Sequence, residues 1–348
     1  MLTRWMLYGA YGRTGRLILD EALRRGHRPL LAGRDGGRLA ALGHDTGLET
    51  AHAPLEDERG LRAALAAVDC VLPAAGPYDL TGPPMRAACC DIGCSYMDVS
   101  GELDDFSRAL ACDAAARAAG IGIIPGAGYG VVFGECLAAH VARRVPGATW
   151  LRLSLATETE GHSRAATLST AAAMTAGGRD VYEGALRRRP IATPTWRGPG
   201  IDRPVFAAAP RPELVAALHS TGIPNIVAGI PMPRAVAGFV RVAGPWLGKA
   251  IAWRGARIAS TPEPPTPDGA ASVLRSRVWA EIGDELGTKA AAVLETGEGY
   301  RAAAEAAVRS LELQLHEPRV GALTPVQAFG AELALLVPGT HIQELDRP

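Results

Sequence analysis

The sequence predicts an α/β fold: an N-terminal Rossmann-type, doubly wound parallel sheet, followed by an inserted α+β domain with a mostly antiparallel sheet. A glycine-rich turn stands directly behind the first apolar run, and short apolar strands then alternate with helical segments up to about residue 130. From Trp150 onward, polar and apolar residues alternate. Repeated strand and helix units are typical of parallel sheets, whereas polar–apolar alternation is typical of antiparallel sheets with one face in water.

The glycine-rich turn predicts a dinucleotide site. An apolar run from Trp5 to Tyr8 precedes the sequence GAYGRTGR, and the helical pattern LILDEALRRG follows it. A helix that begins in such a turn offers unpaired N–H groups and its positive dipole end to a diphosphate. The spacing is G-x-x-G-x-x-G, and the alternative interpretation is a glycine-rich surface loop. The residues expected to hold the cofactor here are Gly9, Ala10, Tyr11, Gly12, Arg13, Thr14 and Gly15.

The end of the second strand indicates which dinucleotide is bound. PLLAGRD places Arg34 where the adenosine ribose would lie, a position at which NAD-specific sites usually have an acid. An arginine there can pair with a 2′-phosphate, and Arg13 is expected to reach the same group from the other side. The alternative is that both are solvated surface arginines, and the neighbouring Asp35 would suit NAD(H). We expect NADP(H).

The remainder of the first domain brings further loops to the same edge of the sheet. Helices are expected in GGRLAALGHDTG, LRAALAAVD, GPPMRAACCDIG and LDDFSRALACDAAARAAG, and strands in CVLPAAG, SYMDVS and IGIIPGAG. Ligands of doubly wound sheets bind outside the carboxyl ends of the strands. Three stretches therefore converge with the first turn: AAGPY (Ala74 to Tyr78), MDVSGE (Met97 to Glu102) and PGAGYG (Pro125 to Gly130).

The second half of the chain predicts a different domain. Strands are expected at WLRLSLATE, TPTWRG and PVFAAA, two antiparallel strands in SVLRSRVWAEIGDELGTKAAAVLETGEGY, and a helix behind Ser163. Residues 225–253 are the most apolar long stretch, but prolines and arginines interrupt it. A buried protein helix is favoured there over peripheral membrane contact, and a membrane span is excluded. Helices from Tyr300 to Leu315 and after Pro325 end the chain.

Composition excludes several classes of protein. The 36 acidic and 36 basic residues argue against a general binder of nucleic acid or anionic membranes. Both lysines lack a tyrosine four residues earlier, so the Tyr-x-x-x-Lys device of short-chain dehydrogenases is absent. No secretory signal precedes the first strand, so we expect a cytoplasmic protein. The six cysteines lie within the first 136 residues, and we expect small buried thiols and no metal site.

These stretches together resemble the saccharopine dehydrogenase-like family, which includes trans-acting enoyl reductases of lipid and polyketide pathways. The motifs are YGAYGRTGR, LLAGRD, AAGPYDLTGPPMRAACCDIGCSYMDVSGE, PGAGYGVVFGECLAAHVA, GHSRAATLSTAAAM, GEGYRAAAEAAVRSLEL and GALTPVQAFG. The resemblance implies an NADP-binding domain at 1–130, completed by 302–348, and a substrate or dimerisation domain at 131–301. It places Ala75, Gly76 and Pro77 beside the nicotinamide. The family's acid at the end of a strand corresponds to Asp98, and the Gly-Glu pair that follows it corresponds to Gly101 and Glu102.

The sequence departs from the family pattern at two places. Where many relatives read GFDxVPSD, this chain reads GYGVVFGE, which removes an acid at Gly130 and a proline at Phe133. The family's Ser-Arg-Gly-Thr loop is here Ser163, Arg164 and two alanines. A different substrate preference is therefore expected.

Hydride transfer needs an oriented nicotinamide and one proton donor. Tyr78 is the first choice for the donor and Tyr129 the second; the alternative is that each hydroxyl bonds the backbone. Asp98 and Glu102 are placed to orient a substrate amine or a water, or else to cap the helix that starts near Leu103, which is favoured for Glu102.

Two residues of the second domain complete the predicted site. Arg164 is expected to hold a carboxylate or phosphate, including that of a thioester carrier, and His162 is a candidate proton relay, although a lone histidine is more often structural. We therefore expect an NADP(H)-dependent reductase of a C=C (enoyl) or C=N (imine) bond in a small or carrier-tethered metabolite. The alternative is a non-catalytic NADP-binding scaffold. Assembly into a homodimer stays open.

Overall fold

The computed structural model describes residues 4–159, 175, 177–196, 198, 201–207, 211–253 and 273–345. The chain forms two compact units, each assembled from separate segments. The first unit comprises Met1–Ser100, Asp104–Tyr129 and Tyr300–Phe329, and the second comprises Gly101–Leu103, Gly130–Gly299 and Gly330–Pro348. In the described part of the chain, no helix is both long and apolar enough to cross a bilayer.

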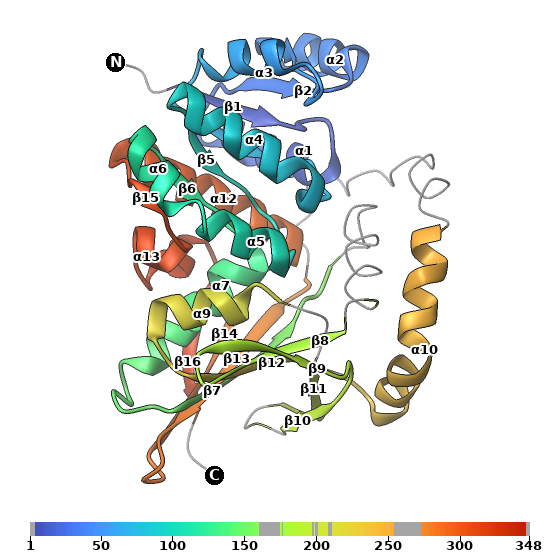
Figure 1. Ribbon diagram of the computed structural model, residues 1–348, viewed down its shortest axis with the longest axis vertical. Coiled ribbons are helices and arrows are strands. Elements are labelled where there is room, and N and C mark those ends of the chain that lie inside the picture. Colours follow the sequence, from blue (N-terminus) through green and yellow to red (C-terminus); the bar gives the residue numbers. More distant parts are fainter. Residues whose placement is uncertain are drawn as a thin grey trace. The chain divides into compact units, whose positions relative to one another are not determined.

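The first unit is built on a seven-stranded sheet in which every pair of neighbours is parallel (Figure 1). Its strands are β1 (Trp5–Tyr8), β2 (Leu30–Gly33), β3 (Thr50–His52), β4 (Cys70–Pro73), β5 (Ser95–Met97), β6 (Gly122–Ile124) and β15 (Gly321–Ala322). Its helices are α1 (Arg13–Arg24), α2 (Gly36–Thr46), α3 (Glu58–Leu65), α4 (Tyr78–Ile92), α5 (Leu103–Leu110), α6 (Asp113–Ala119), α12 (Gly299–His316) and α13 (Pro325–Phe329). The strand order β15-β6-β5-β4-β1-β2-β3 confirms the predicted doubly wound sheet.

Helices bury both faces of this sheet. Successive side chains of a strand point to opposite faces, so Trp5 and Leu7 of β1 join one apolar cluster with α1, α2 and α12. Met6 and Tyr8 join a second cluster with α3, α4 and α6. This arrangement explains why the strands read as short continuous apolar runs rather than as alternating patterns.

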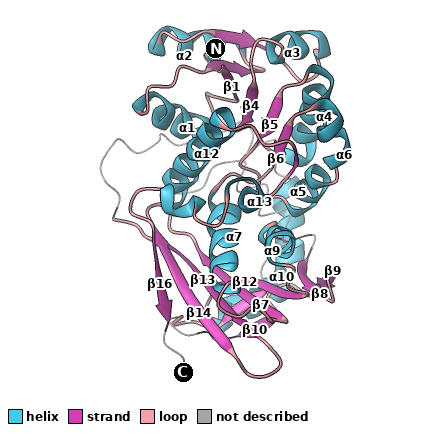
Figure 2. Ribbon diagram, turned by 90° about the vertical axis from the view of Figure 1, so that its left-hand side faces the viewer, coloured by secondary structure: helices cyan, strands magenta, loops and turns pink. Residues whose placement is uncertain are grey.

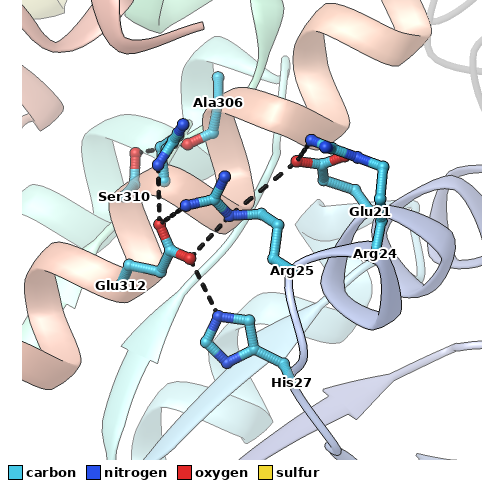
Figure 3. A network of polar contacts seen from close by, with 8 residues as sticks. Glu21, Arg24, Arg25, His27, Ala306, Ser310 and Glu312 are labelled. Atoms are coloured by element: carbon cyan, nitrogen blue, oxygen red, sulfur yellow. Dashed lines mark hydrogen bonds and ion pairs between the residues drawn. The ribbon is translucent and has the colours of Figure 1, made fainter.

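The returning helix α12 is held to α1 by a network of charges (Figure 3). Arg25 makes two hydrogen bonds to Glu312, with nitrogen–oxygen distances of 2.7 and 2.6 Å, and His27 Nε2 lies 3.0 Å from the same carboxylate. Burial alone would raise the pKa of Glu312, but the hydrogen bonds with Arg25 and His27 outweigh it and lower that pKa. The network therefore favours an ionised Glu312.

The second unit contains a nine-stranded mixed sheet that is mostly antiparallel, as predicted. Its strands are β7 (Trp150–Ala156), β8 (Gly178–Tyr182), β9 (Ala185–Arg189), β10 (Pro194–Trp196), β11 (Val205–Ala207), β12 (Asn225–Pro231), β13 (Ser276–Gly283), β14 (Lys289–Thr296) and β16 (His341–Leu345). Its helices are α7 (Tyr129–Ala142), α9 (Glu213–Thr221), α10 (Arg234–Trp253) and the 3₁₀ turn η1 (Leu333–Leu336). Figure 2 shows β13 and β14 as a long hairpin, and among the described strands of this second sheet only the β7–β12 pair is parallel.

Several predicted boundaries differ from the structure. Residues 225–253 are not one helix, because β12 pairs with β7 and β11 before α10 begins. The tail from Gly330 does not complete the first unit; β16 hydrogen-bonds to β14 of the second sheet. The predicted helix over LDDFSRALACDAAARAAG is two helices, α5 and α6. The helix expected behind Ser163 lies outside the described residues.

The favoured interpretation of 225–253 as a buried helix is also wrong for α10. Its inner residues Ala237 and Val240 pack with Phe206 of β11. Its outer side exposes large apolar side chains, among them Phe239 and Trp246. The apolar character of this stretch therefore reflects two different elements, one of which is only half covered.

The cysteines behave as small buried side chains. Four of the six, Cys70, Cys89, Cys94 and Cys136, are buried and none is in a disulfide. Burial raises the pKa of Cys70 and Cys89 well above the usual thiol range. Among the residues that the structure describes, no group of three or more His, Cys, Asp or Glu side chains is placed to hold a metal ion.

Candidate functional site

The three glycines of the first turn have different environments. Gly9 has a φ of +80°, and a Cβ added there would lie 2.7 Å from that of Ala75. A Cβ at Gly15 would overlap the carbonyl oxygen of Gly9. At Gly12 the nearest atom to an added Cβ is Gly9 O at 3.4 Å, an ordinary contact. Gly9 and Gly15 thus close the turn on itself, while Gly12 leaves its backbone open to a ligand.

The helix behind this turn starts without the cap that its neighbours have. Asp35 caps α2 by accepting from Arg38 N at 3.0 Å, and Asp57 caps α3 by accepting from Gly60 N at 3.0 Å. Among the described residues, no side chain caps α1, whose N-cap is Gly12, and its first turn has no acid. The first turn of α1 is therefore suited to an external anion, as a diphosphate-binding helix requires.

The end of β2 presents positive charge. Arg34 and Arg38 are exposed, and the guanidinium carbon of Arg38 lies 5.2 Å from the centre of the Tyr11 ring. The Tyr11 hydroxyl accepts from Asp35 N at 3.2 Å, and the Tyr11 ring fills the space that a side chain at Gly33 would need. One oxygen of the Asp35 carboxylate is engaged as the cap of α2.

Arg13 does not occupy the place expected for it. Its side chain is 6% exposed, and its guanidinium carbon lies 4.7 Å from the centre of the Tyr300 ring of α12. This cation–π contact ties the start of α1 to the returning helix. The expectation that Arg13 also reaches the 2′-phosphate has no support in this position. Elsewhere in the turn, Ala10 is fully buried and Thr14 is half-buried.

The AAGPY loop lies against the glycine turn, as the contact between Ala75 and Gly9 shows. The Ala75 carbonyl accepts a hydrogen bond of 2.8 Å from the Thr81 hydroxyl, which fastens the loop to α4. Tyr78 begins α4, is 7% exposed, and donates its hydroxyl proton to the carbonyl oxygen of Pro73 at 3.1 Å. Our first choice of proton donor therefore fits the alternative interpretation, a tyrosine whose hydroxyl bonds the backbone.

Asp98 joins two loops at the carboxyl ends of β5 and β6. Its carboxylate accepts from the Tyr96 hydroxyl at 2.6 Å and from the backbone N–H groups of Ser100 and Gly126 at 2.9 and 2.8 Å. The side chain is completely buried. Burial first, and then the Asp98 charge, raise the pKa of Tyr96 well above its ordinary value. The buried Asp98 carboxylate thus holds the strand-end loops together.

Behind this carboxylate lies a buried ion pair that the sequence reasoning missed. Arg86 of α4 makes two hydrogen bonds, of 2.9 and 2.6 Å, to Asp105 of α5. Burial would lower the pKa of Arg86, but its bond to Asp105 raises it instead. Gly82 leaves the space for this pair, since a Cβ there would lie 2.8 Å from an Asp105 oxygen. The sequence signal that could have indicated this ion pair is a charged residue on an otherwise apolar face of each helix.

Ser100 and Tyr129 are two further nearly buried residues of this region. Ser100 is 3% exposed, and its hydroxyl has no hydrogen-bond partner among the described residues. Tyr129 is 8% exposed and begins α7 after the loop that Asp98 holds. Asp98 and Ser100 thus lie in a loop at the carboxyl end of a strand, and Tyr129 directly follows another such loop, in the region where ligands of such sheets bind. Ser100 had no distinguishing sequence signal beyond its place in MDVSGE.

Glu102 lies in the second unit. The Glu102 carboxylate accepts from Gly101 N at 3.0 Å. His162 and Arg164 lie outside the described residues.

The acid that many relatives have in place of Gly130 would find no room here, because an added Cβ would overlap the carboxylate of Glu213 from α9. Glu213 is buried and pairs with Arg211 at 2.7 Å. A distant segment therefore supplies a carboxylate beside Gly130.

Comparisons with known proteins agree with this geometry. Residues 9–121 match the NAD(P)H-binding family. A trans-acting enoyl reductase of Mycobacterium tuberculosis is 36% identical over 105 residues, which are 28% of this chain and 25% of that protein. A probable mitochondrial saccharopine dehydrogenase-like oxidoreductase of Arabidopsis thaliana is 31% identical over 124 residues, 30% of this chain and 26% of that protein. The matches thus span about a quarter of the length of these curated relatives.

The fold has a solved counterpart over the whole chain. Apo saccharopine dehydrogenase (L-Glu forming) from Saccharomyces cerevisiae superposes with a TM-score of 0.62 at 13% identity, covering 99% of this chain and 100% of that one. At this identity the likeness shows the fold alone. Together, the comparisons confirm the resemblance that the sequence motifs indicated.

Proposed function

Residues 9–121 form an NAD(P)H-binding domain with enoyl reductase and saccharopine dehydrogenase-like homologues, and from this premise we propose that the chain is an NADPH-dependent reductase. Its proposed substrate is a C=C bond of an enoyl thioester or a C=N bond of an imine, in a small or carrier-tethered metabolite. The observation that carries the proposal is the glycine-rich turn between β1 and α1, in which no side chain caps the start of α1.

NADP(H) is proposed over NAD(H) because of the charges at the end of β2. Arg34 and Arg38 are exposed there, and Asp35, which follows Arg34 in the sequence, is engaged as the cap of α2. Two guanidinium groups suit a 2′-phosphate, whereas a ribose 2′-hydroxyl would need a carboxylate. Arg38 thus joins the predicted Arg34 as a proposed specificity residue.

The proposed mechanism assigns each group of residues one task. The turn from Gly9 to Gly15 holds the diphosphate through backbone N–H groups, and the loop from Ala75 to Pro77 supports the nicotinamide ring. Bound NADPH supplies the hydride for the substrate double bond. With the Tyr78 hydroxyl engaged by Pro73, Tyr129 is the proposed donor of the balancing proton, to the α-carbon of the enoyl group or the imine nitrogen.

Stopped-flow absorbance at the NADPH band, with a panel of enoyl thioesters and imines, tests this function. We expect oxidation of NADPH by at least one class. Tyr129→Phe is expected to lower kcat with the Kd of NADPH unchanged, and Tyr78→Phe serves as the matched control with much smaller loss of kcat. Tight NADPH binding without oxidation by any substrate would instead support a cofactor-binding scaffold.

The proposed function also carries an expectation for the location and the oligomeric state of the protein. A carrier-tethered substrate would place the protein beside a thioester-forming enzyme, and we propose a cytoplasmic location and a homodimer. Gel filtration with light scattering, and fractionation of cells that express the full chain, test these two points.

A further inference from the structure

The outer side of α10 is an unusually large exposed apolar surface. Phe239, Val242, Trp246 and Trp253 are exposed by 61, 77, 74 and 81%. At 3.6 residues per turn these four positions fall within an arc of about 60° on the helix. They therefore form one continuous stripe, which we call the α10 stripe, rather than scattered surface residues.

The opposite side of the same helix is already covered. Ala237 packs in a buried cluster with Phe206 of β11, and Val240 packs against that cluster. Gly244 and Gly248 are also buried. Small inner residues thus let α10 lie close on its own unit, so the α10 stripe faces away from this packing and has no apolar cover among the described residues.

Charge on α10 is of one sign. Its charged residues are Arg234, Arg241 and Lys249, and the helix contains no acid. The whole stretch from 214 to 262 lacks aspartate and glutamate. At 3.6 residues per turn all three basic positions fall on one flank of the helix, between the stripe and the buried side: Lys249 lies about 20° from the edge of the stripe, and Arg234 and Arg241 lie about 80° and 100° from it. The Lys249 ammonium lies 5.7 Å from the centre of the Trp246 ring. The equal totals of acids and bases in the chain conceal this local separation of charge.

We propose that α10 is an interfacial helix that lies in the headgroup region of an anionic lipid bilayer. A basic flank beside an apolar stripe with tryptophans is the pattern of helices that rest on membranes, where indole rings favour the interface and arginine and lysine attract anionic headgroups. Among the described helices, α10 included, none is both long and apolar enough to span a bilayer. This binding is independent of the reductase activity proposed above.

The test is flotation of the full chain with vesicles of phosphatidylcholine alone or mixed with phosphatidylglycerol. We expect flotation with the mixed vesicles and little with the neutral ones. Trp246→Ala with Trp253→Ala should weaken binding by roughly tenfold or more. Arg241→Glu and Lys249→Glu should each weaken it by roughly fivefold or more.

Matched controls separate the stripe from general surface effects. Leu286→Ala removes an equally exposed apolar side chain from the turn between β13 and β14, and Arg59→Glu reverses an exposed charge on α3. Both should leave flotation unchanged. Since all substituted side chains are exposed, thermal unfolding and the Kd of NADPH should match wild type and show that the variants are folded.

A second readout reports insertion directly. Brominated acyl chains should quench part of the tryptophan fluorescence, and this part should disappear in the Trp246→Phe, Trp253→Phe protein. The proposal is overturned if the full chain fails to float with anionic vesicles, or if the tryptophan variant floats as well as wild type. A dimer interface is the competing explanation. The proposal is also overturned if sedimentation shows a dimer that does not float with vesicles, and if the same substitutions on the α10 stripe dissociate this dimer into monomers.

Discussion

At the scale of single residues, the turn between β1 and α1 assigns a different task to each glycine. Gly15 makes room for the Gly9 carbonyl, whereas Gly12 has free space beside it. At the end of β2, Asp35 caps α2, while Arg34 beside it is exposed. Cofactor binding and fold stability should therefore respond separately to substitutions only one helical turn apart.

Gly12→Ala is expected to leave the free energy of unfolding within about 1 kcal/mol of wild type while weakening NADPH and NADH alike, since its methyl group occupies the approach of the diphosphate. Gly15→Ala should lower the free energy of unfolding by roughly 1–3 kcal/mol, because its Cβ overlaps the Gly9 carbonyl. Urea unfolding and fluorescence titration measure both. Unchanged nucleotide affinity in Gly12→Ala would contradict a diphosphate site in this turn.

Arg34→Ala should weaken NADPH by roughly 1–3 kcal/mol, through loss of a charge-assisted pair, and leave NADH nearly unaffected. Arg38→Ala should do the same to a smaller extent. Arg59→Ala, at an exposed site on α3, is the control. Calorimetric titration with both nucleotides measures the difference; equal losses for NADPH and NADH would refute the assignment to the 2′-phosphate.

At the scale of elements, the first unit depends on helix α12, which arrives from the far end of the sequence. Apolar residues such as Ala304 and Val308 bury it on the sheet, and Glu312 fixes its end to Arg25 and His27 of the segment after α1. Burial of the apolar face supplies most of the attachment, because the hydrophobic effect scales with the area removed from water. The Glu312 carboxylate fixes the position of α12 along the segment after α1, since its two parallel hydrogen bonds to the Arg25 guanidinium allow one geometry.

Glu312→Gln tests this attachment through pH. The folded-state pKa of Glu312 is lowered below its ordinary value of 4.5, so its ionisation stabilises the fold above that pH. This contribution should disappear as the pH falls from about 4.5 through the lowered pKa. The variant should be less stable than wild type at pH 7, by roughly 1–3 kcal/mol, and approach it in acid.

Urea unfolding at several pH values measures this convergence. Glu49→Gln, in the exposed pair with Arg4, serves as the control and should change little. A constant difference between wild type and Glu312→Gln at every pH would contradict the role given to ionised Glu312.

At the scale of the whole molecule, each unit draws on separated segments of the chain. β15 and α12 complete the first unit, and β16 completes the second sheet beside β14. Neither unit is therefore a continuous piece of sequence, and truncation at either end removes structural elements. At this scale the test is whether bound nucleotide stabilises the folded chain as a whole.

NADPH should raise the unfolding temperature of the full chain. At a free concentration one hundred times its Kd, the expected stabilisation is about 2.7 kcal/mol for one site on the folded state. NADH at the same concentration should stabilise less. Hydrogen exchange should slow most in the turns after β1 and β2. Differential scanning calorimetry and exchange mass spectrometry measure these effects, and the absence of any shift with either nucleotide would remove the basis for the proposed function.

Local sequence determined much of the first unit. Continuous apolar runs and the glycine spacing predicted the parallel sheet and the nucleotide turn, because strand burial and positive φ depend on the residues themselves. The same local signals predicted β7, β10, β11 and the β13–β14 hairpin. The loops at the carboxyl ends of β4, β5 and β6 could be named for the same reason, since parallel strands bring these ends to one edge.

Tertiary structure alone decided what the polar side chains of those loops do. The Tyr78 hydroxyl bonds Pro73, Asp98 holds Ser100 and Gly126, and Arg13 lies on Tyr300. Sequence also could not place β16 beside β14 or leave the α10 stripe exposed. Periodicity reports whether a residue prefers burial, but the partner that buries it or satisfies its hydrogen bonds comes from distant segments, and only the folded chain brings those together.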